Sequence, residues 1–451
     1  MNVGKNQVSL VKKAKTFIDI LNKKKIDTSL SSFCYFCSWA EEPGYAKLKL
    51  WLKGNLFFLS YIKILFKNFL SIASKTKYIE ISNNKSIEKF DLIIITWCYR
   101  ENFKSDGSIN DRYFSENSKD IPNAHWILIS MDDFIPKNIN ENITIIKRQK
   151  SYPKYNFFSF LKILFLSLRE NNFSLKKVFH YSYFSSYFSK IILNTLQKKI
   201  NNSEIKAILM PYEAQNFQNK VFFEVKKKNQ NIRTIGYLHS LNPFPTEQIH
   251  RPGAPDLLLV HGSSQIEILK SKLYWPHHKL KLHDSFRYRK NYNTEKHFNK
   301  IFLPLSILKS SLWLKELEKL LKNSKKGSLP VFKIQNHPAA LNSDIHLKLV
   351  KRIGEILKNY DDRFSNKISN NLSICFGVTD LLERFEMGVN IYHISADPVM
   401  ETYSEEMWEN INVKQLSKFT FRYSLIKKGN FIMFGDKNKT LHNTLKPYII
   451  S

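Results

Sequence analysis

Three polar segments in the middle of the chain each follow a short apolar run and carry side chains that can accept protons or bind anions. The first, Met-Pro-Tyr-Glu-Ala-Gln, carries Glu213. The second, Gly-Tyr-Leu-His-Ser, carries His239 and Ser240, and the third, Val-His-Gly-Ser-Ser, carries His261. If the apolar runs are parallel strands, their carboxyl ends meet at one edge of a sheet. We therefore expect these side chains to share one crevice.

A second group of polar residues lies in the last third of the chain. Lys-Ile-Gln-Asn-His-Pro places His337 and Pro338 after another apolar run, and the proline ends the strand and presets a turn. Farther on, Cys-Phe-Gly-Val-Thr-Asp-Leu-Leu-Glu carries Gly377, Thr379 and Glu383. We expect a helix to begin near Thr379, where free N–H groups and a partial positive charge favour an anion. Thr379 can either cap this helix or donate to a phosphate, and Glu383 can either accept from ribose hydroxyls or be an exposed helical glutamate.

These two segments of the last third resemble the carboxyl-terminal half of GT-B glycosyltransferases. They look most like the bacterial group that contains sialyltransferases and Kdo transferases, and CDP-glycerol-type transferases share similar landmarks. The resemblance covers roughly residues 200–410 and rests on short motifs. It implies that His337 and Thr379 contact the donor phosphate and that Glu383 contacts the ribose, with Pro338 and Gly377 at the same nucleotide site.

The order of motifs in the middle of the chain also looks like that of surface-polysaccharide glycosyltransferases. There a glutamate precedes Gly-Tyr-x-His-Ser and then a Pro-Asp strand. The resemblance implies that Ser240 and Arg287, the latter in Ser-Phe-Arg-Tyr, lie at the donor side of the cleft. One departure is visible, because family members often have Lys-x-His-Pro, whereas Lys333 here lies farther from His337. We assign no role to this lysine.

Glycosyl transfer needs a base that deprotonates the acceptor hydroxyl, or a nucleophile if the anomeric configuration is retained. Glu213 is the first candidate, and the alternative is that it caps the following helix. Asp111, in Asn-Asp-Arg-Tyr-Phe, is the second candidate. His239 is a candidate base or a ligand of a donor carboxylate, and the alternative is a buried histidine bonded to the backbone. We find no motif for a nucleotide-bound metal and expect neither a metal nor a cofactor.

The elements that must position these residues alternate between short apolar runs and helical patterns from about residue 78 onward. This alternation predicts the α/β class, with two Rossmann-like domains facing a cleft in a GT-B-like arrangement. We expect an acceptor-side domain at 1–285 and a nucleotide-sugar-binding domain at 286–451, with a polar linker over 285–299. Predicted helices cover 216–228, 264–272, 311–322, 345–359 and 379–387. Predicted strands cover 78–81, 92–97, 126–131, 143–146, 207–210, 234–239, 257–261, 279–283, 301–305, 331–334, 372–376, 390–394 and 431–434.

The chain has 451 residues and a formal net charge of +31, and 58 of its 70 basic residues are lysines. Reading of bases and bidentate phosphate contacts favour arginine, so we do not expect nucleic acid as a partner. The four cysteines do not make a disulfide framework, and the lone Cys-x-x-C of Cys34 and Cys37 lacks a second ligand pair. We interpret them as ordinary thiols of a protein in the reducing cytoplasm.

Two apolar stretches edged with lysine, Leu50–Ala73 and Tyr155–Leu168, have the pattern of helices that lie in a membrane interface. The alternative is a pair of core helices of a large domain. Residues 1–100 carry a net charge of +10 and residues 151–200 one of +7, which favours an anionic surface. We therefore expect contact with the inner face of the cell membrane, without a spanning helix.

The sequence leaves three functions open. The first is transfer of an acidic sugar from a CMP donor to a cell-surface polysaccharide, such as a capsule or lipopolysaccharide, or to a lipid-linked acceptor. The second is transfer of a polyol phosphate from a CDP-linked donor. The third is a non-catalytic basic protein at a membrane.

Overall fold

The computed structural model describes most of the two predicted domains. The described residues are 2–23, 77–82, 90–121, 123–130, 134–149, 185–202, 204–289, 299–305, 307, 309–337, 340, 343–365, 371–377, 381–428, 430–436 and 441–449. Both lysine-edged apolar stretches, the Cys-x-x-C motif, Pro338 and Thr379 lie outside them. Within the described residues, no helix combines the length and apolar character needed to cross a membrane.

The first part of the chain builds an eight-stranded sheet in the order β1-β4-β3-β2-β5-β6-β7-β8. All neighbouring strands are parallel except β1 and β4. The direction of winding reverses between β2 and β5, which is where ligands bind in sheets of this kind. The strands are β1 (Lys77–Ser82), β2 (Leu92–Cys98), β3 (Ala124–Ser130), β4 (Ile143–Gln149), β5 (Ala207–Pro211), β6 (Arg233–Leu238), β7 (Leu257–Val260) and β8 (Leu280–Leu282).

Both faces of this sheet are covered, which explains why its strands are continuous apolar runs. In β2, Ile93 and Ile95 point into one core, and Leu92 and Ile94 point into the other. Helix α7 (Asn216–Lys228) buries residues at helical spacing on the first face, and α13 (Leu441–Ile449) covers the second. Helices α6 (Ser185–Asn202) and α8 (Ser263–Ser271) also pack on the first face.

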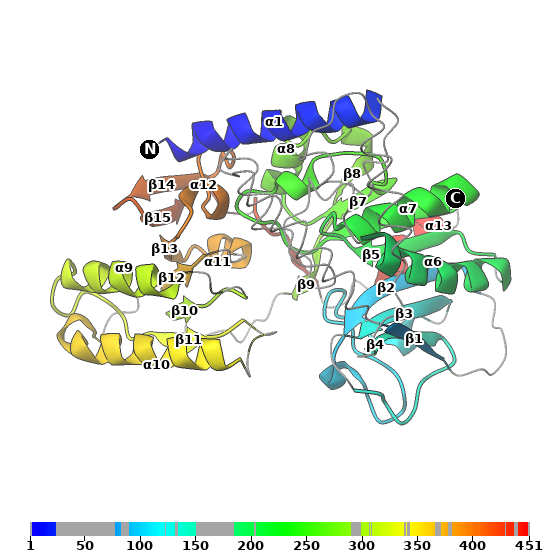
Figure 1. Ribbon diagram of the computed structural model, residues 1–451, viewed down its shortest axis with the longest axis horizontal. Coiled ribbons are helices and arrows are strands. Elements are labelled where there is room, and N and C mark those ends of the chain that lie inside the picture. Colours follow the sequence, from blue (N-terminus) through cyan, green and yellow to red (C-terminus); the bar gives the residue numbers. More distant parts are fainter. Residues whose placement is uncertain are drawn as a thin grey trace, which may run out of the picture.

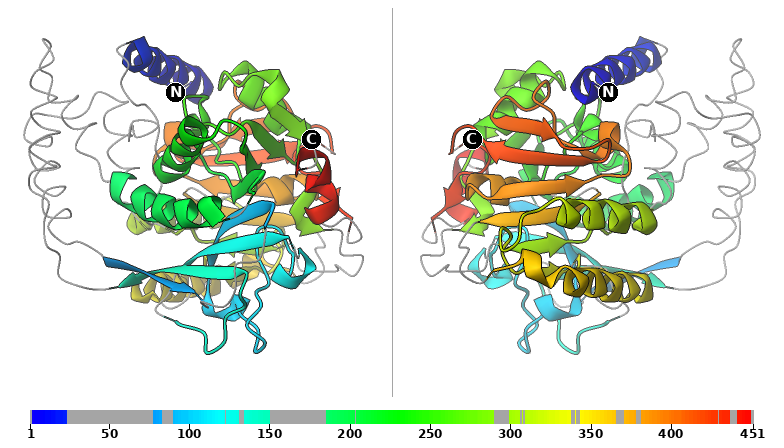
Figure 2. Two further views of the ribbon diagram at one scale, coloured as in Figure 1. Left: turned by 90° about the vertical axis from the view of Figure 1, so that its right-hand side faces the viewer. Right: turned by 90° about the vertical axis from the view of Figure 1, so that its left-hand side faces the viewer.

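A six-stranded sheet follows in the order β11-β10-β12-β13-β15-β14. Strands β10 to β13 are parallel, and β14 and β15 add an antiparallel edge. Helices α9 (Ser310–Lys322) and α10 (Asp344–Asn359) lie side by side on one face (Figures 1 and 2). The strands are β10 (Lys300–Phe302), β11 (Lys333–Gln335), β12 (Leu372–Phe376), β13 (Asn390–Ile394), β14 (Ile411–Gln415) and β15 (Thr420–Leu425), and the other helices are α11 (Leu382–Glu386) and α12 (Pro398–Glu401).

Several segments connect the two sheets. Helix α1 (Val3–Lys23) lies along both parts in Figure 1, and its Gln7 donates to the carbonyls of Val399 and Thr402, at 2.9 and 2.7 Å. Strand β9 (Ser285–Arg289) pairs with β16 (Phe434–Gly435) between the sheets. One apolar cluster runs continuously through both parts. The division at 285/286 therefore remains a prediction, with α1 and α13 each packing against the other part of the chain.

The predicted fold class, α/β with two Rossmann-like sheets, is confirmed. Three local predictions need correction. The expected linker over 285–299 begins as strand β9, because Ser285 and Phe286 are buried. The helix expected near Thr379 begins at Leu382, and the strand expected over 431–434 is reduced to β16.

Candidate active site

The register of β5 and β6 brings Glu213 and His239 together. Pro211 pairs with Tyr237 at the ends of these parallel strands, so Glu213 and His239 each lie two residues beyond a paired position. His239 Nε2 donates to Glu213 Oε1 at 3.1 Å. The pair stands at the carboxyl end of β5, beside the point where the winding of the sheet reverses.

The Glu213 carboxylate remains partly accessible, whereas its partner is buried. The Glu213 side chain is 38% exposed and the His239 side chain 4%. Gln215 Nε2 donates to the other carboxylate oxygen at 2.6 Å. Burial would raise the pKa of Glu213, but the bonds from His239 and Gln215 and the positive charge of Arg287 outweigh burial and lower the pKa. The carboxylate is therefore ionised at neutral pH and can accept a proton.

The structure does not show the structural alternative for either residue, and their roles in catalysis stay predictions. Helix α7 begins at Asn216, and the Glu213 carboxylate binds two side chains instead of capping that helix. The Nε2 atom of His239 binds a carboxylate and not the backbone. Ser240 follows His239 directly and is half-buried, and its place at the donor stays a prediction.

Asp111 lies below the surface and holds a loop. Its Oδ1 accepts the N–H groups of Tyr113 and Phe114, at 2.8 and 2.7 Å, and its Oδ2 accepts the hydroxyl of Thr96 at 2.8 Å. Burial raises its pKa to about 6, although these bonds and the charge of His239 oppose the rise. Because both oxygens are engaged and the residue is 5% exposed, the geometry favours a structural role over that of a base.

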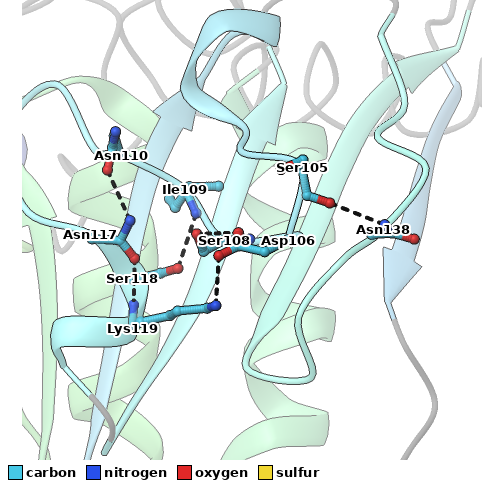
Figure 3. Close-up of polar contacts among 9 residues, drawn as sticks. All are labelled: Ser105, Asp106, Ser108, Ile109, Asn110, Asn117, Ser118, Lys119 and Asn138. Atoms are coloured by element: carbon cyan, nitrogen blue, oxygen red, sulfur yellow. Dashed lines mark hydrogen bonds and ion pairs between the residues drawn. The ribbon is translucent and has the colours of Figure 1, made fainter.

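The loop that carries Asp111 between β2 and β3 is fixed by polar contacts, drawn in Figure 3. Asp106 pairs with Lys119 at 2.6 Å and accepts the N–H and hydroxyl of Ser108. The side chains of Asn110 and Asn117 bond to each other at 3.0 Å. These contacts close the loop on itself and present its middle to the ends of β5 and β6.

One residue of this loop, Tyr113, contacts the site and a second, Arg112, lies within electrostatic range of His337, and the sequence analysis gave a role to neither. The ring of Tyr113 meets the His239 imidazole edge-on, with centroids 4.6 Å apart. Arg112 is partly exposed and lies over the ring of Tyr99. Their adjacency to Asp111 was the available signal, because a loop that brings one side chain to the site brings its neighbours too.

Arg287 reaches the same site from β9. Its backbone N–H donates to the Tyr237 hydroxyl at 3.3 Å, and the same hydroxyl accepts the N–H of Phe286 at 3.1 Å. This hydroxyl also bonds to Ser285 Oγ and to His261 Nδ1. Tyr237 thus anchors β9 to the sheet and leaves the Arg287 side chain exposed.

His337 follows β11 on the second sheet and lies within electrostatic range of this cluster. Burial lowers its pKa, and the positive charges of His346, Arg287 and Arg112 lower it further, while Glu213 raises it. Arg287, Arg112 and Glu213 all belong to the first part of the chain. Of the residues singled out in the sequence, Glu213 and His239 are in direct contact, and Asp111, Arg287 and His337 lie within electrostatic range of that pair.

Gly377 shapes the end of β12. Its φ is +59°, and a Cβ atom there would lie 3.1 Å from the Trp313 ring and 3.3 Å from Pro304. His393 Nε2 donates to its carbonyl at 2.6 Å. Glu383 lies in the first turn of α11 and is half-buried, and its contact with a ribose stays a prediction.

No protein-family model and no curated protein matches the sequence. Among solved structures, the chain is similar to the N-terminal domain of a trehalose-6-phosphate phosphatase from Candida albicans, at 10% identity and a TM-score of 0.32, over 67% of this chain and 79% of that one. It is similar to an α,α-trehalose 6-phosphate synthase from Burkholderia multivorans, at 10% identity and a TM-score of 0.33, over 65% and 77%. A glycosyltransferase from Rickettsia africae ESF-5 matches at 10% identity and a TM-score of 0.30, over 70% and 86%. These likenesses are distant, and no residue or substrate is carried over from them.

Proposed function

We propose that the protein is a metal-independent glycosyltransferase of the GT-B type. It transfers an acidic sugar from a CMP-linked donor to a cell-surface polysaccharide or a lipid-linked acceptor. The observation that carries the proposal is the Glu213–His239 pair at the reversal point of one sheet, with His337 of the other sheet in its electrostatic environment.

In the proposed step, Glu213 takes the proton of the acceptor hydroxyl. The acceptor oxygen forms a bond to the anomeric carbon, and the bond from that carbon to the phosphate oxygen breaks. The electron pair leaves with the nucleotide phosphate. The bond from His239 keeps the Glu213 carboxylate ionised and oriented, which a general base requires.

In this proposal, Arg112 and Arg287 of the first part of the chain supply positive charge to the leaving phosphate. His337 of the second part has a lowered pKa and is neutral at pH 7, so its imidazole N–H donates a hydrogen bond to the phosphate. Arginine suits this task because its planar fork binds phosphate oxygens in pairs. Preorganised charge of this kind stabilises a departing anion at little reorganisation cost.

A thermal-shift series tests the proposal. CMP, UDP, GDP and CDP are added separately to the purified protein, and we expect CMP to raise the Tm most. His337→Ala should reduce that rise, whereas the exposed His278→Ala should not. If no nucleotide raises the Tm, or if His337→Ala leaves the rise intact, the donor site is misassigned. Product mass then identifies the group moved, because phosphorus enters the acceptor only if a polyol phosphate is transferred.

The membrane part of the proposal rests on sequence alone. The stretches Leu50–Ala73 and Tyr155–Leu168 lie outside the described residues. We propose that they hold the enzyme on the anionic inner face of the cell membrane, where lipid-linked acceptors reside. Flotation with anionic vesicles but not with neutral vesicles is the expected result, and no flotation with either would contradict it.

A further inference from the structure

The turn that carries Glu213 has a backbone conformation that needs support. Ala214, the next residue, has a φ of +55°, in the left-handed region that non-glycine residues rarely adopt. The turn links β5 to α7, so its conformation sets the direction in which the Glu213 side chain leaves the backbone. Groups that hold Ala214 in place therefore also aim the carboxylate.

Two side chains from α7 fold back onto this turn. Gln218 Oε1 accepts the N–H groups of Glu213 and Gln215, both at 3.0 Å, and Gln218 Nε2 donates to the carbonyl of Pro211 at 2.7 Å. Asn219 Nδ2 donates to the carbonyl of Ala214 at 3.0 Å.

The remaining support comes from Arg251, which lies far along the chain and is 2% exposed. One of its terminal nitrogens, Nη2, donates to the carbonyl of Ala214 at 2.8 Å. The other, Nη1, donates to the carbonyl of Glu247 at 2.6 Å. A buried guanidinium that bonds to backbone carbonyls on two separate loops holds these loops at a fixed separation, since its fork is planar and the directions of its donors are fixed.

We propose that Arg251 is the positioning residue of Glu213. It fixes the strained turn at Ala214 against the turn that begins at Thr246, and so holds the carboxylate at the angle at which His239 and the acceptor hydroxyl meet it. The kinetic consequence of this inference rests on the proposed function, whereas its geometric consequence does not.

The kinetic test is Arg251→Lys, because lysine lacks the planar fork whose two nitrogens bind the Ala214 and Glu247 carbonyls separately. Misplacing a catalytic group by an ångström costs up to about 100-fold in rate, so we expect kcat to fall by at least ~10-fold while the KM for the donor changes little. In a Glu213→Gln background the same substitution should cause no further loss. Arg363→Lys is the matched control, since Arg363 also donates to a carbonyl, that of Ser324, but on the second part of the chain. If the losses from Arg251→Lys and Glu213→Gln multiply, Arg251 does not act through Glu213.

A second readout needs no activity. The titration of the Glu213 carboxyl is followed by ¹³C NMR and assigned with Glu213→Gln. Arg251→Lys should move its midpoint upward, because a carboxylate that has turned away loses the bonds from His239 and Gln215. Arg363→Lys should leave the midpoint in place, and an unchanged midpoint in Arg251→Lys would overturn the inference. If the wild-type protein transfers no sugar but the midpoint moves, the proposed function fails and the positioning role stands.

Should Arg251→Lys not fold, Asn219→Ser removes the other donor to the Ala214 carbonyl. It should move the rate and the midpoint in the same directions by smaller amounts. No change in either quantity would contradict the claim that the Ala214 turn aims Glu213.

Discussion

His337 on the second sheet and Glu213 on the first lie close enough for the carboxylate charge to raise the pKa of the imidazole. The loops that carry them are separated by more than a hundred residues in sequence, and each follows a strand of its own sheet. Under the proposed function, Glu213 is the proton acceptor and His337 contacts the donor phosphate, so this relationship puts the two proposed roles on opposite sides of one site.

Asp111 should make stability depend on pH. Because burial raises its pKa to about 6, the folded state holds its proton at pH values where the unfolded state, with a pKa of about 3.9, has lost it. The free energy of unfolding should therefore fall as pH rises through this window. Asp111→Asn keeps an oxygen for the N–H groups of Tyr113 and Phe114 and has no charge. Urea unfolding at about pH 4 and pH 7 should show the variant gaining on the order of 1–3 kcal/mol relative to wild type over this interval. If the free energies of unfolding of wild type and Asp111→Asn change equally between these pH values, the pKa of Asp111 is not raised in the folded state.

Glu247 should also make the free energy of unfolding fall as pH rises, over a range that extends to a higher pH than for Asp111. Burial raises the pKa of Glu247 to about 8, and the charge of Glu213 adds to the rise, although the bond from Asn242 opposes it. Glu247→Gln preserves the acceptor for Asn242 and should gain stability over wild type as pH rises from about 4.3, the ordinary pKa of glutamate, to about 8. Glu247→Ala leaves the Asn242 amide without that partner, which should cost about 1–3 kcal/mol at neutral pH. Unfolding curves of the three proteins at several pH values check both expectations, and equal effects of Gln and Ala would contradict them.

The hydroxyl of Tyr237 should matter for both stability and binding. Tyr237→Phe removes the acceptor of the N–H groups of Phe286 and Arg287, and we expect a loss of about 1–3 kcal/mol in the free energy of unfolding. Affinity for CMP should also fall, because β9 would no longer hold Arg287 in place. Tyr274→Phe, at an exposed ring, serves as control and should change neither quantity. A Tyr237→Phe protein that binds CMP like wild type would show that β9 is held by other contacts.

Substitution by alanine should lower the free energy of unfolding at Gly377 and raise it at Gly354. Gly377 has a positive φ and lies against Trp313, so Gly377→Ala should destabilise the protein by about 1–3 kcal/mol. Gly354 lies within α10 with nothing within 4 Å of the added Cβ, so Gly354→Ala should stabilise it by about 0.5–1 kcal/mol. Urea unfolding measures the free energy of unfolding of both variants relative to wild type. If both substitutions stabilise the protein, the turn after β12 does not require glycine at position 377.

Much of the fold was predictable because burial on both faces leaves a strong signal. Helix α7 covers the predicted range, and most parallel strands lie within a few residues of theirs. Strands β14 and β15 were missed because they form an antiparallel edge whose exposed residues interrupt the apolar pattern. Strand β9 was missed because its arginines give the segment the polar composition of a linker, and because its partner β16 lies far along the chain.

Site residues that directly follow a strand could be predicted from the sequence. Residues that act on the site through the conformation of a turn could not. Glu213 and His239 follow neighbouring strands, so the rule that ligands bind at carboxyl ends was enough to pair them. Arg251 is recognisable only once the left-handed conformation of Ala214 is known, since it binds a carbonyl and not a side chain. Asp111 was ranked as a base because its burial was not visible in the sequence.

Titration calorimetry with CMP measures whether one donor site is built from both sheets. Arg287→Ala removes positive charge from one side of the site, and His337→Ala removes an imidazole hydrogen-bond donor from the other. Loss of a charge-assisted bond is worth about 1.5–3 kcal/mol, so each variant should weaken CMP binding by roughly 10-fold or more. We expect both single variants to weaken binding and the double variant to weaken it further. Binding that depends on only one of the two residues, or on neither, would contradict it.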